Sequence, residues 1–121
     1  MKRIGLLLLA AILFFSSCVE REHTIYIYAT TDVHGNYIGE NSLSNVKSYV
    51  DLKRAEYGEK SVFLIDNGDH LQGTNAAYYF NFKDTTGGKH LFTRVMANIG
   101  YDAVVMGNHD IEAGHPVYDK V

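Results

Sequence analysis

The sequence has 121 residues, of which 46% are hydrophobic and 21% charged, so there is room for at most one domain and enough apolar content to fold it. Its formal net charge of −3 argues against the basic groove of a nucleic-acid-binding protein, and we expect no nucleic acid as a partner. The absence of low-complexity tracts and of solenoid-period repeats excludes disordered and repeat classes.

Residues 1–17 have the pattern of a signal peptide. Lys2 and Arg3 give a positive start, and an almost unbroken apolar run over residues 4–15 follows them. The run is shorter than the roughly 20 apolar residues of a membrane span, so a transmembrane anchor is the less favoured alternative. Removing the two positive charges of Lys2 and Arg3 from the net charge of −3 leaves −5 for the rest of the chain.

Ser16, Ser17 and Cys18 follow the apolar run and resemble the bacterial lipobox, whose cysteine is lipidated and becomes the new N-terminus. Cys18 is the only cysteine of the sequence, which favours lipidation over a simple secretory leader with an incidental thiol. We expect cleavage before Cys18 and a tether over residues 18–23. The resemblance implies a lipid anchor in a membrane. Val19 is not the aspartate that retains lipoproteins at the inner membrane, so the outer membrane of a Gram-negative bacterium is favoured.

Residues 24–121 alternate between predicted strands and helices. Residues 25–29 are β-branched and aromatic on both alternating faces, which predicts a strand covered on both sides. Ser42 or Ser44 can cap a helix whose apolar residues recur at helical spacing up to Gly58. The continuous apolar run at residues 62–65, bounded by turn-forming residues, predicts a second buried strand.

The alternation continues in the second half of this region. An aromatic loop is expected around residues 78–82, with its rings in core or interface packing. Residues 91–99 have a helical pattern that Gly100 ends, and residues 103–106 form the third predicted strand. The order β-α-β-α-β predicts an α/β fold with mostly parallel strands, in which ligands bind beyond the carboxyl ends of the strands.

Polar motifs follow all three predicted strands. Asp32 and His34 come after the first strand, and their spacing of two lets both side chains grip one metal ion. Asp69 comes after the second strand, where its two carboxylate oxygens can bridge two ions. Asn108 and His109 come after the third strand and offer an amide oxygen and an acid or hydrogen-bond donor. Each motif alone is typical of turns and caps, but three at corresponding strand ends indicate a metal site.

The motifs Asp-x-His, Gly-Asp and Gly-Asn-His-Asp stand at residues 32–34, 68–69 and 107–110, and in this order they resemble those of the calcineurin-like metallophosphoesterases. The resemblance spans residues 24 to about 118. The tripeptide Gln72-Gly73-Thr74 is similar to the branch of 5'-nucleotidases and 2',3'-cyclic-nucleotide phosphodiesterases. For residues 24–121 this implies the N-terminal part of a metallophosphoesterase α/β sandwich, incomplete in this chain.

The resemblance implies two divalent metal ions about 3.5 to 4 Å apart, which activate water for in-line attack on phosphorus. Asp32 and His34 would hold one ion, Asp69 would bridge both, and Asn108 would hold the other. The donors do not distinguish Zn, Mn, Mg, Fe and Ca.

The catalytic residue that the resemblance implies is His109, which would stabilise the transition state or protonate the leaving oxygen. Its acid partner would be Asp110 or Glu112. Glu112 stands where the nucleotidase branch often has Asp, and it is the second catalytic residue that we expect. Three further histidines, His23, His70 and His90, are predicted to be structural or solvated.

The implied function is nucleotide catabolism outside the cytoplasm by a metal-dependent hydrolase of the 5'-nucleotidase or cyclic phosphodiesterase type. Its partners would be a nucleotide or another phosphoester and, through the lipid, a membrane. The family also has a later histidine and a Gly-His-x-His motif, which this sequence lacks, so we expect a truncated chain that is inactive alone. The alternatives are a non-catalytic surface lipoprotein that uses the fold as a binding module and an enzyme with another substrate.

Overall fold

The structure is a computed structural model that describes residues 22–121, so the expected signal peptide and Cys18 lie outside the described residues. Its elements in chain order are β1 (Tyr26–Thr30), α2 (Leu43–Tyr57), the 3-10 turn η1 (Glu59–Ser61), β2 (Val62–Asp66), α3 (Asn75–Phe82), α4 (Leu91–Ile99), β3 (Ala103–Val104), α5 (Asn108–Ile111) and α6 (His115–Tyr118). None of the helices between residues 22 and 121 has the length and apolar character to cross a membrane.

The three strands form one parallel sheet in the order β1-β2-β3, which confirms the predicted α/β fold. Tyr28 lies opposite Leu64, and Ile65 lies opposite Ala103. The third strand is shorter than the predicted 103–106. Its pairing ends because β2 ends at Asp66, whose carbonyl oxygen accepts a last bond of 3.0 Å from the backbone N–H of Val105.

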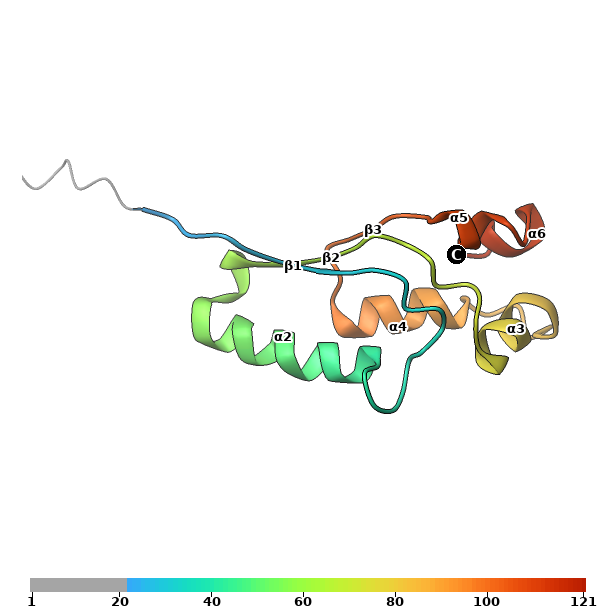
Figure 1. Ribbon diagram of the computed structural model, residues 1–121, viewed down its shortest axis with the longest axis horizontal. Coiled ribbons are helices and arrows are strands. Elements are labelled where there is room, and N and C mark those ends of the chain that lie inside the picture. The colour runs from blue at the N-terminus through green and yellow to red at the C-terminus, as the bar shows by residue number, and fades with distance from the viewer. Residues whose placement is uncertain (1–21) are drawn as a thin grey trace, which may run out of the picture.

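The predicted helices α2 and α4 are confirmed, and both lie on the same side of the sheet (Figure 1). Each ends at a glycine with positive φ, Gly58 at 92° and Gly100 at 84°. This is the usual way for a helix to end, because glycine adopts such angles without steric cost. The helices bury their apolar faces against the inward side chains of β2 in one core, formed by Leu43, Val50, Val62, Leu64, Phe92, Met96 and Ile99.

The prediction that both faces of the strands are covered is wrong for the described residues. Along β2 the side chains alternate between buried and exposed, and Leu64 is fully buried while Phe63 is 40% exposed. The same outer face carries Ile27, which is 65% exposed, and Ile65. A continuous apolar run shows that both faces of a strand are apolar, but it does not show that both are covered.

The expected aromatic loop is wrong as well, because residues 75–82 form helix α3. Thr74 caps this helix by accepting a hydrogen bond of 3.1 Å from the N–H of Ala77, and Asn81 anchors it by donating to the carbonyl oxygen of Leu71. The exposed side chains of α3 include Tyr78, Tyr79 and Phe82, so they are not in the core. Aromatic residues are only moderate helix formers, and the cap decides the local structure.

Candidate functional site

The loops that follow the three strands meet at one edge of the sheet. The N–H of Asp32 donates to the carbonyl oxygen of Gly68 at 3.0 Å, and the N–H of His34 donates to that of Asp69 at 2.8 Å. The N–H of His109 donates to Oδ1 of Asp69 at 2.9 Å. Because neighbouring parallel strands end on the same side of a sheet, residues that lie 35, 36 and 40 positions apart become direct hydrogen-bond partners.

The side chains of the predicted site converge on this edge. Nε2 of His34 lies 3.9 Å from Oδ1 of Asp32, and the rings of His34 and His109 have their centroids 5.3 Å apart. Asp69 contacts both residues, because its backbone carbonyl oxygen accepts from the N–H of His34 and its Oδ1 accepts from the N–H of His109. Asn108 is the first residue of α5, immediately before His109. The structure therefore gathers Asp32, His34, Asp69 and His109, while the roles of these residues and of Asn108 stay predictions.

Three of the predicted ligands have a backbone conformation that non-glycine residues rarely adopt. The φ angles are 54° at Asp32, 49° at His34 and 66° at Asp69, and in the described part of the chain Asn41 is the one further non-glycine residue with positive φ. Such a conformation costs about 1–3 kcal/mol per residue and persists where the surroundings enforce it. Strain concentrated at these three positions indicates a functional site.

Glycines let the loops approach each other closely. A Cβ on Gly68 would lie 2.5 Å from the backbone nitrogen of Gly107, and a Cβ on Gly107 would lie 2.6 Å from the backbone nitrogen of Asp69. A Cβ on Gly73 would lie 2.7 Å from the carbonyl oxygen of His34. The glycines of the second and third motifs are therefore required by the contact between loops as well as by turning of the chain.

His109 is paired with Glu112 rather than with Asp110. Its Nδ1 lies 3.2 Å from Oε1 of Glu112, which is an ion-pair distance. This contact raises the pKa of His109 and lowers the pKa of Glu112. The other oxygen of Glu112 accepts a hydrogen bond of 2.8 Å from the side-chain amide of Gln72. Since Glu112 faces Nδ1, the ring nitrogen left for a substrate is Nε2 of His109.

Asp110, the other candidate partner of His109, is buried with its oxygens directed at the backbone. Burial opposes its ionisation, but hydrogen bonds from the N–H groups of Leu71, Gly107, His70 and Asp69 outweigh burial and lower the pKa of Asp110. A carboxylate held in this way is ionised and has no oxygen lone pair aimed at the His109 ring.

Sequence reasoning missed the role of Asp66 at the end of β2. Its carboxylate is buried, accepts a hydrogen bond of 2.7 Å from the N–H of Gly68, and contacts Thr30 and the ring of His70. The signal was present, because Asp66 continues the inward alternation of Val62 and Leu64. A carboxylate at an inward strand position must find partners, and here it fixes the start of the second loop.

His70, His90 and His23 behave as predicted. His70 is fully buried beside Asp66, and His90 caps α4 by accepting a hydrogen bond of 3.2 Å from the N–H of Phe92. His23 is exposed ahead of β1. None of them lies among the predicted site residues.

Comparison with known proteins gives partial matches. The sequence is 29% identical to the trifunctional nucleotide phosphoesterase protein YfkN of Bacillus subtilis (strain 168), over 73% of this chain. The fold matches the crystal structure of the calcineurin-like phosphoesterase YfkN from Bacillus subtilis with a TM-score of 0.69 and 26% identity over 79% of this chain. The resemblance to the calcineurin-like metallophosphoesterases is confirmed. It includes the nucleotidase branch, and the structure corresponds to the N-terminal part of the calcineurin-like fold.

Both matches are to much longer chains. The chain spans 7% of the curated relative and 33% of the solved one. No family model matches the sequence. The calcineurin-like phosphoesterases are hydrolases that generally use divalent metals.

The donor set fits divalent metals in its chemistry, since it combines carboxylate, imidazole and amide oxygen. Donors about 2.0–2.2 Å from one ion can be separated by up to about 4.4 Å, and Asp32 and His34 are separated by 3.9 Å. Within residues 22–121, however, no three His, Cys, Asp or Glu side chains come together as a complete metal site. Among the predicted ligands, the pair Asp32 and His34 therefore has a spacing that one metal ion can span.

The tripeptide Gln72-Gly73-Thr74, which resembles the nucleotidase branch, makes structural contacts in this fold. Gln72 bonds Glu112, Gly73 packs on His34, and Thr74 caps α3 while its hydroxyl donates to the carbonyl oxygen of Gly35 at 3.2 Å. All three residues therefore shape the surroundings of His34 and His109. Their part in nucleotide recognition stays a prediction.

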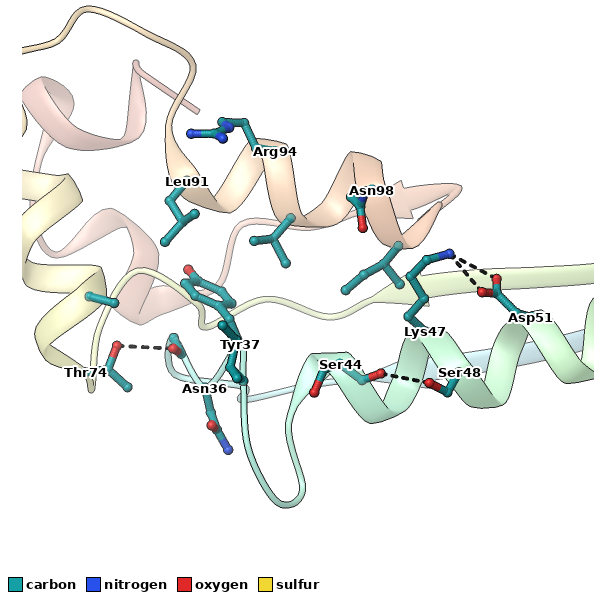
Figure 2. A pocket seen from close by; sticks show the side chains of 15 residues that line it. Asn36, Tyr37, Ser44, Lys47, Ser48, Asp51, Thr74, Leu91, Arg94 and Asn98 are labelled. Atoms are coloured by element: carbon teal, nitrogen blue, oxygen red, sulfur yellow. Dashed lines mark hydrogen bonds and ion pairs between the residues drawn. The ribbon is translucent and has the colours of Figure 1, made fainter.

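A cavity of about 880 Å³ lies between α2 and α4, close to the site but separate from it (Figure 2). Its wall includes Tyr37, Leu91 and Val95, and Lys47 at its edge is paired with Asp51 at 2.9 Å. None of the predicted metal ligands or catalytic residues lines it. Asp32 instead lines a smaller hollow of about 400 Å³ at the end of β1.

Proposed function

We propose that this chain belongs to a metal-dependent phosphoesterase that hydrolyses nucleotides, of the 5'-nucleotidase or 2',3'-cyclic-nucleotide phosphodiesterase type. The observation that carries the proposal is the convergence of Asp32, His34, Asp69 and His109 from three strand ends onto one edge of the sheet. The similar Bacillus subtilis protein is described as a nucleotide phosphoesterase, which supports nucleotides as the substrate class.

The residues divide into two groups by what they can do. Asp32 and His34 would hold one divalent ion, and Asp69 and Asn108 would hold a second, with Asp69 shared between them. Bound divalent ions would polarise the phosphoryl group and activate water. Oδ1 of Asp69 accepts a hydrogen bond from the backbone N–H of His109, which fixes the orientation of the Asp69 carboxylate.

His109 would supply the proton chemistry. Glu112 orients the ring through Nδ1 and favours its protonated form, so that Nε2 can donate a hydrogen bond or a proton to the leaving oxygen. Gln72 holds Glu112 from the other side. The contacts from Gln72 to Glu112 and from Glu112 to His109 would thus leave Nε2 of His109 available for the substrate.

The proposal is tested by hydrolysis assays on the full-length gene product. After chelation of metals, we expect no phosphate release from nucleoside 5'-monophosphates or 2',3'-cyclic nucleotides, and recovery when Mn²⁺, Zn²⁺ or Mg²⁺ is added back. Asp69→Asn should abolish the recovery, while Asp51→Asn, on the exposed face of α2, should not change it. A folded protein that hydrolyses no phosphoester with any metal would refute the proposal and favour a non-catalytic binding module.

We also propose that the protein is exported and held at a membrane, at the outer membrane of a Gram-negative cell, by lipid on Cys18. The support is the signal-peptide pattern of residues 1–17 and the position of the single cysteine. In cells fed a radioactive fatty acid, the wild-type protein should be labelled and sediment with membranes. Cys18→Ser should lose the label and leave the membrane fraction, whereas Ser17→Ala should keep both. A labelled Cys18→Ser variant would contradict this assignment.

A further inference from the structure

The carboxylate of Asp110 joins two of the loops that form the site. Its Oδ1 accepts hydrogen bonds from the N–H groups of His70 at 2.6 Å and Leu71 at 2.7 Å. Its Oδ2 accepts from the N–H groups of Asp69 at 2.8 Å and Gly107 at 2.9 Å. The residue is 1% exposed, so these four bonds are shielded from water. One side chain therefore satisfies backbone donors on both the second and the third loop.

The backbone conformation of the second loop explains why three successive N–H groups point at one carboxylate. Gly68 and Asp69 both have positive φ, 97° and 66°. Left-handed residues in such a turn aim consecutive N–H groups into a concavity that binds an anion. Here the anion is Asp110, which belongs to the chain itself. The unusual conformation of Asp69 and the position of Asp110 thus depend on each other.

This arrangement controls the direction of the Asp69 side chain relative to His109. Asp69 is bound at its N–H by Asp110 and at its Oδ1 by the N–H of His109. Asp110 itself follows His109 in α5. A shift of Asp110 would therefore move the carboxylate of Asp69 and the ring of His109 with respect to each other.

We propose that Asp110 is a positioning residue, which aligns Asp69 with His109 by binding the backbone of both loops, and not an acid partner of His109. The inference deepens the proposed function and rests on it for its kinetic consequence. Capping of α5 accounts for the bond from Gly107, but not for the three bonds from the second loop. Asp110 touches no substrate and acts through Asp69.

The test is Asp110→Asn in the full-length protein. Asparagine keeps the size of the side chain but presents an NH₂ group where an oxygen now accepts, so at least one N–H group loses its partner. We expect kcat to fall about 10²-fold with KM little changed, because a displacement of about 1 Å at the reacting groups has that effect. Mn²⁺ affinity should fall, and the amides of residues 69–71 should exchange faster while that of Leu64 keeps its protection. Asp119→Asn, an exposed carboxylate on the last turn, is the matched control.

Each outcome decides the inference. Wild-type kcat in Asp110→Asn overturns it, and so does a general loss of protection that includes Leu64, which would indicate a merely structural role. If Asp110→Asn does not fold, Asp110→Glu keeps the charge but lengthens the side chain, and it should lower kcat at constant KM; unchanged kcat overturns the inference. If the wild type hydrolyses no phosphoester, the proposed function fails, while amide exchange and Mn²⁺ affinity still decide the role of Asp110.

Discussion

Replacing His109 with alanine is expected to lower kcat for nucleotide hydrolysis by the full-length protein about 10²–10⁴-fold. The variant loses the ring whose Nδ1 lies against Glu112 and whose Nε2 faces the substrate in our proposal. The interaction is made with the leaving oxygen, which develops charge in the transition state. For that reason kcat and kcat/KM should fall together, with KM close to its original value. Steady-state kinetics with a nucleoside monophosphate measure both constants.

The matched control for this prediction is His115→Ala. His115 is also a histidine followed at helical spacing by a carboxylate, Asp119, at 3.3 Å, but it is largely exposed on α6 and contacts none of the predicted ligands. It should retain wild-type kinetics. Full activity in His109→Ala would remove His109 from the mechanism and, with it, the main support for hydrolysis at this edge of the sheet.

Gly107→Ala is expected to disrupt the site although alanine suits the backbone conformation. The φ angle of Gly107 is −83°, which any residue can adopt, so the effect comes from space. The new methyl group would overlap Oδ1 of Asp69 and lie 2.6 Å from its backbone nitrogen. Asp69 cannot retreat without breaking its bonds to Asp110 and His109.

The expected size of the Gly107→Ala effect follows from these contacts. Overpacking of this kind typically costs about 1–3 kcal/mol of stability. Displacement of Asp69 should lower activity about 10²-fold or more. Chemical denaturation and kinetics of the full-length protein measure the two effects. Gly88→Ala, where the methyl group would meet no atom closer than 3.8 Å, should be neutral in both. A Gly107→Ala variant with unchanged stability and activity would show that the loops are not packed as described.

Much of the fold could be predicted because local signals agreed with the final structure. The helices α2 and α4 have apolar residues at helical spacing and glycines at their ends, and β2 is an apolar run between turn-forming residues. Helix α3 was missed because its aromatic residues carry no clear period, and the deciding contacts are a cap at Thr74 and an anchor at Asn81. The coverage of the sheet was wrong because it depends on what lies beside a strand.

The site, like the fold, could be predicted from the sequence only in part. Asp32, His34, Asp69, Asn108 and His109 could be named from the sequence, since motifs after successive parallel strands must come to one edge of a sheet. The choice of Glu112 over Asp110 beside His109 could not be made from spacing, because both follow His109 within one helical turn. Burial separates them: Asp110 is enclosed among backbone donors, and Glu112 is exposed on the side of the His109 ring.

The sequence by itself determined which residues bring chemistry to the strand ends and in which order the strands follow. Only the tertiary structure decided which other residues hold them in place. Asp66 and Asp110 accept hydrogen bonds from the backbone of the second loop, and Gly107 packs closely against Asp69. The physical reason, for Asp110 and Gly107, is that a buried carboxylate and a close loop contact are satisfied by partners about 40 residues away in the sequence, which no local pattern contains.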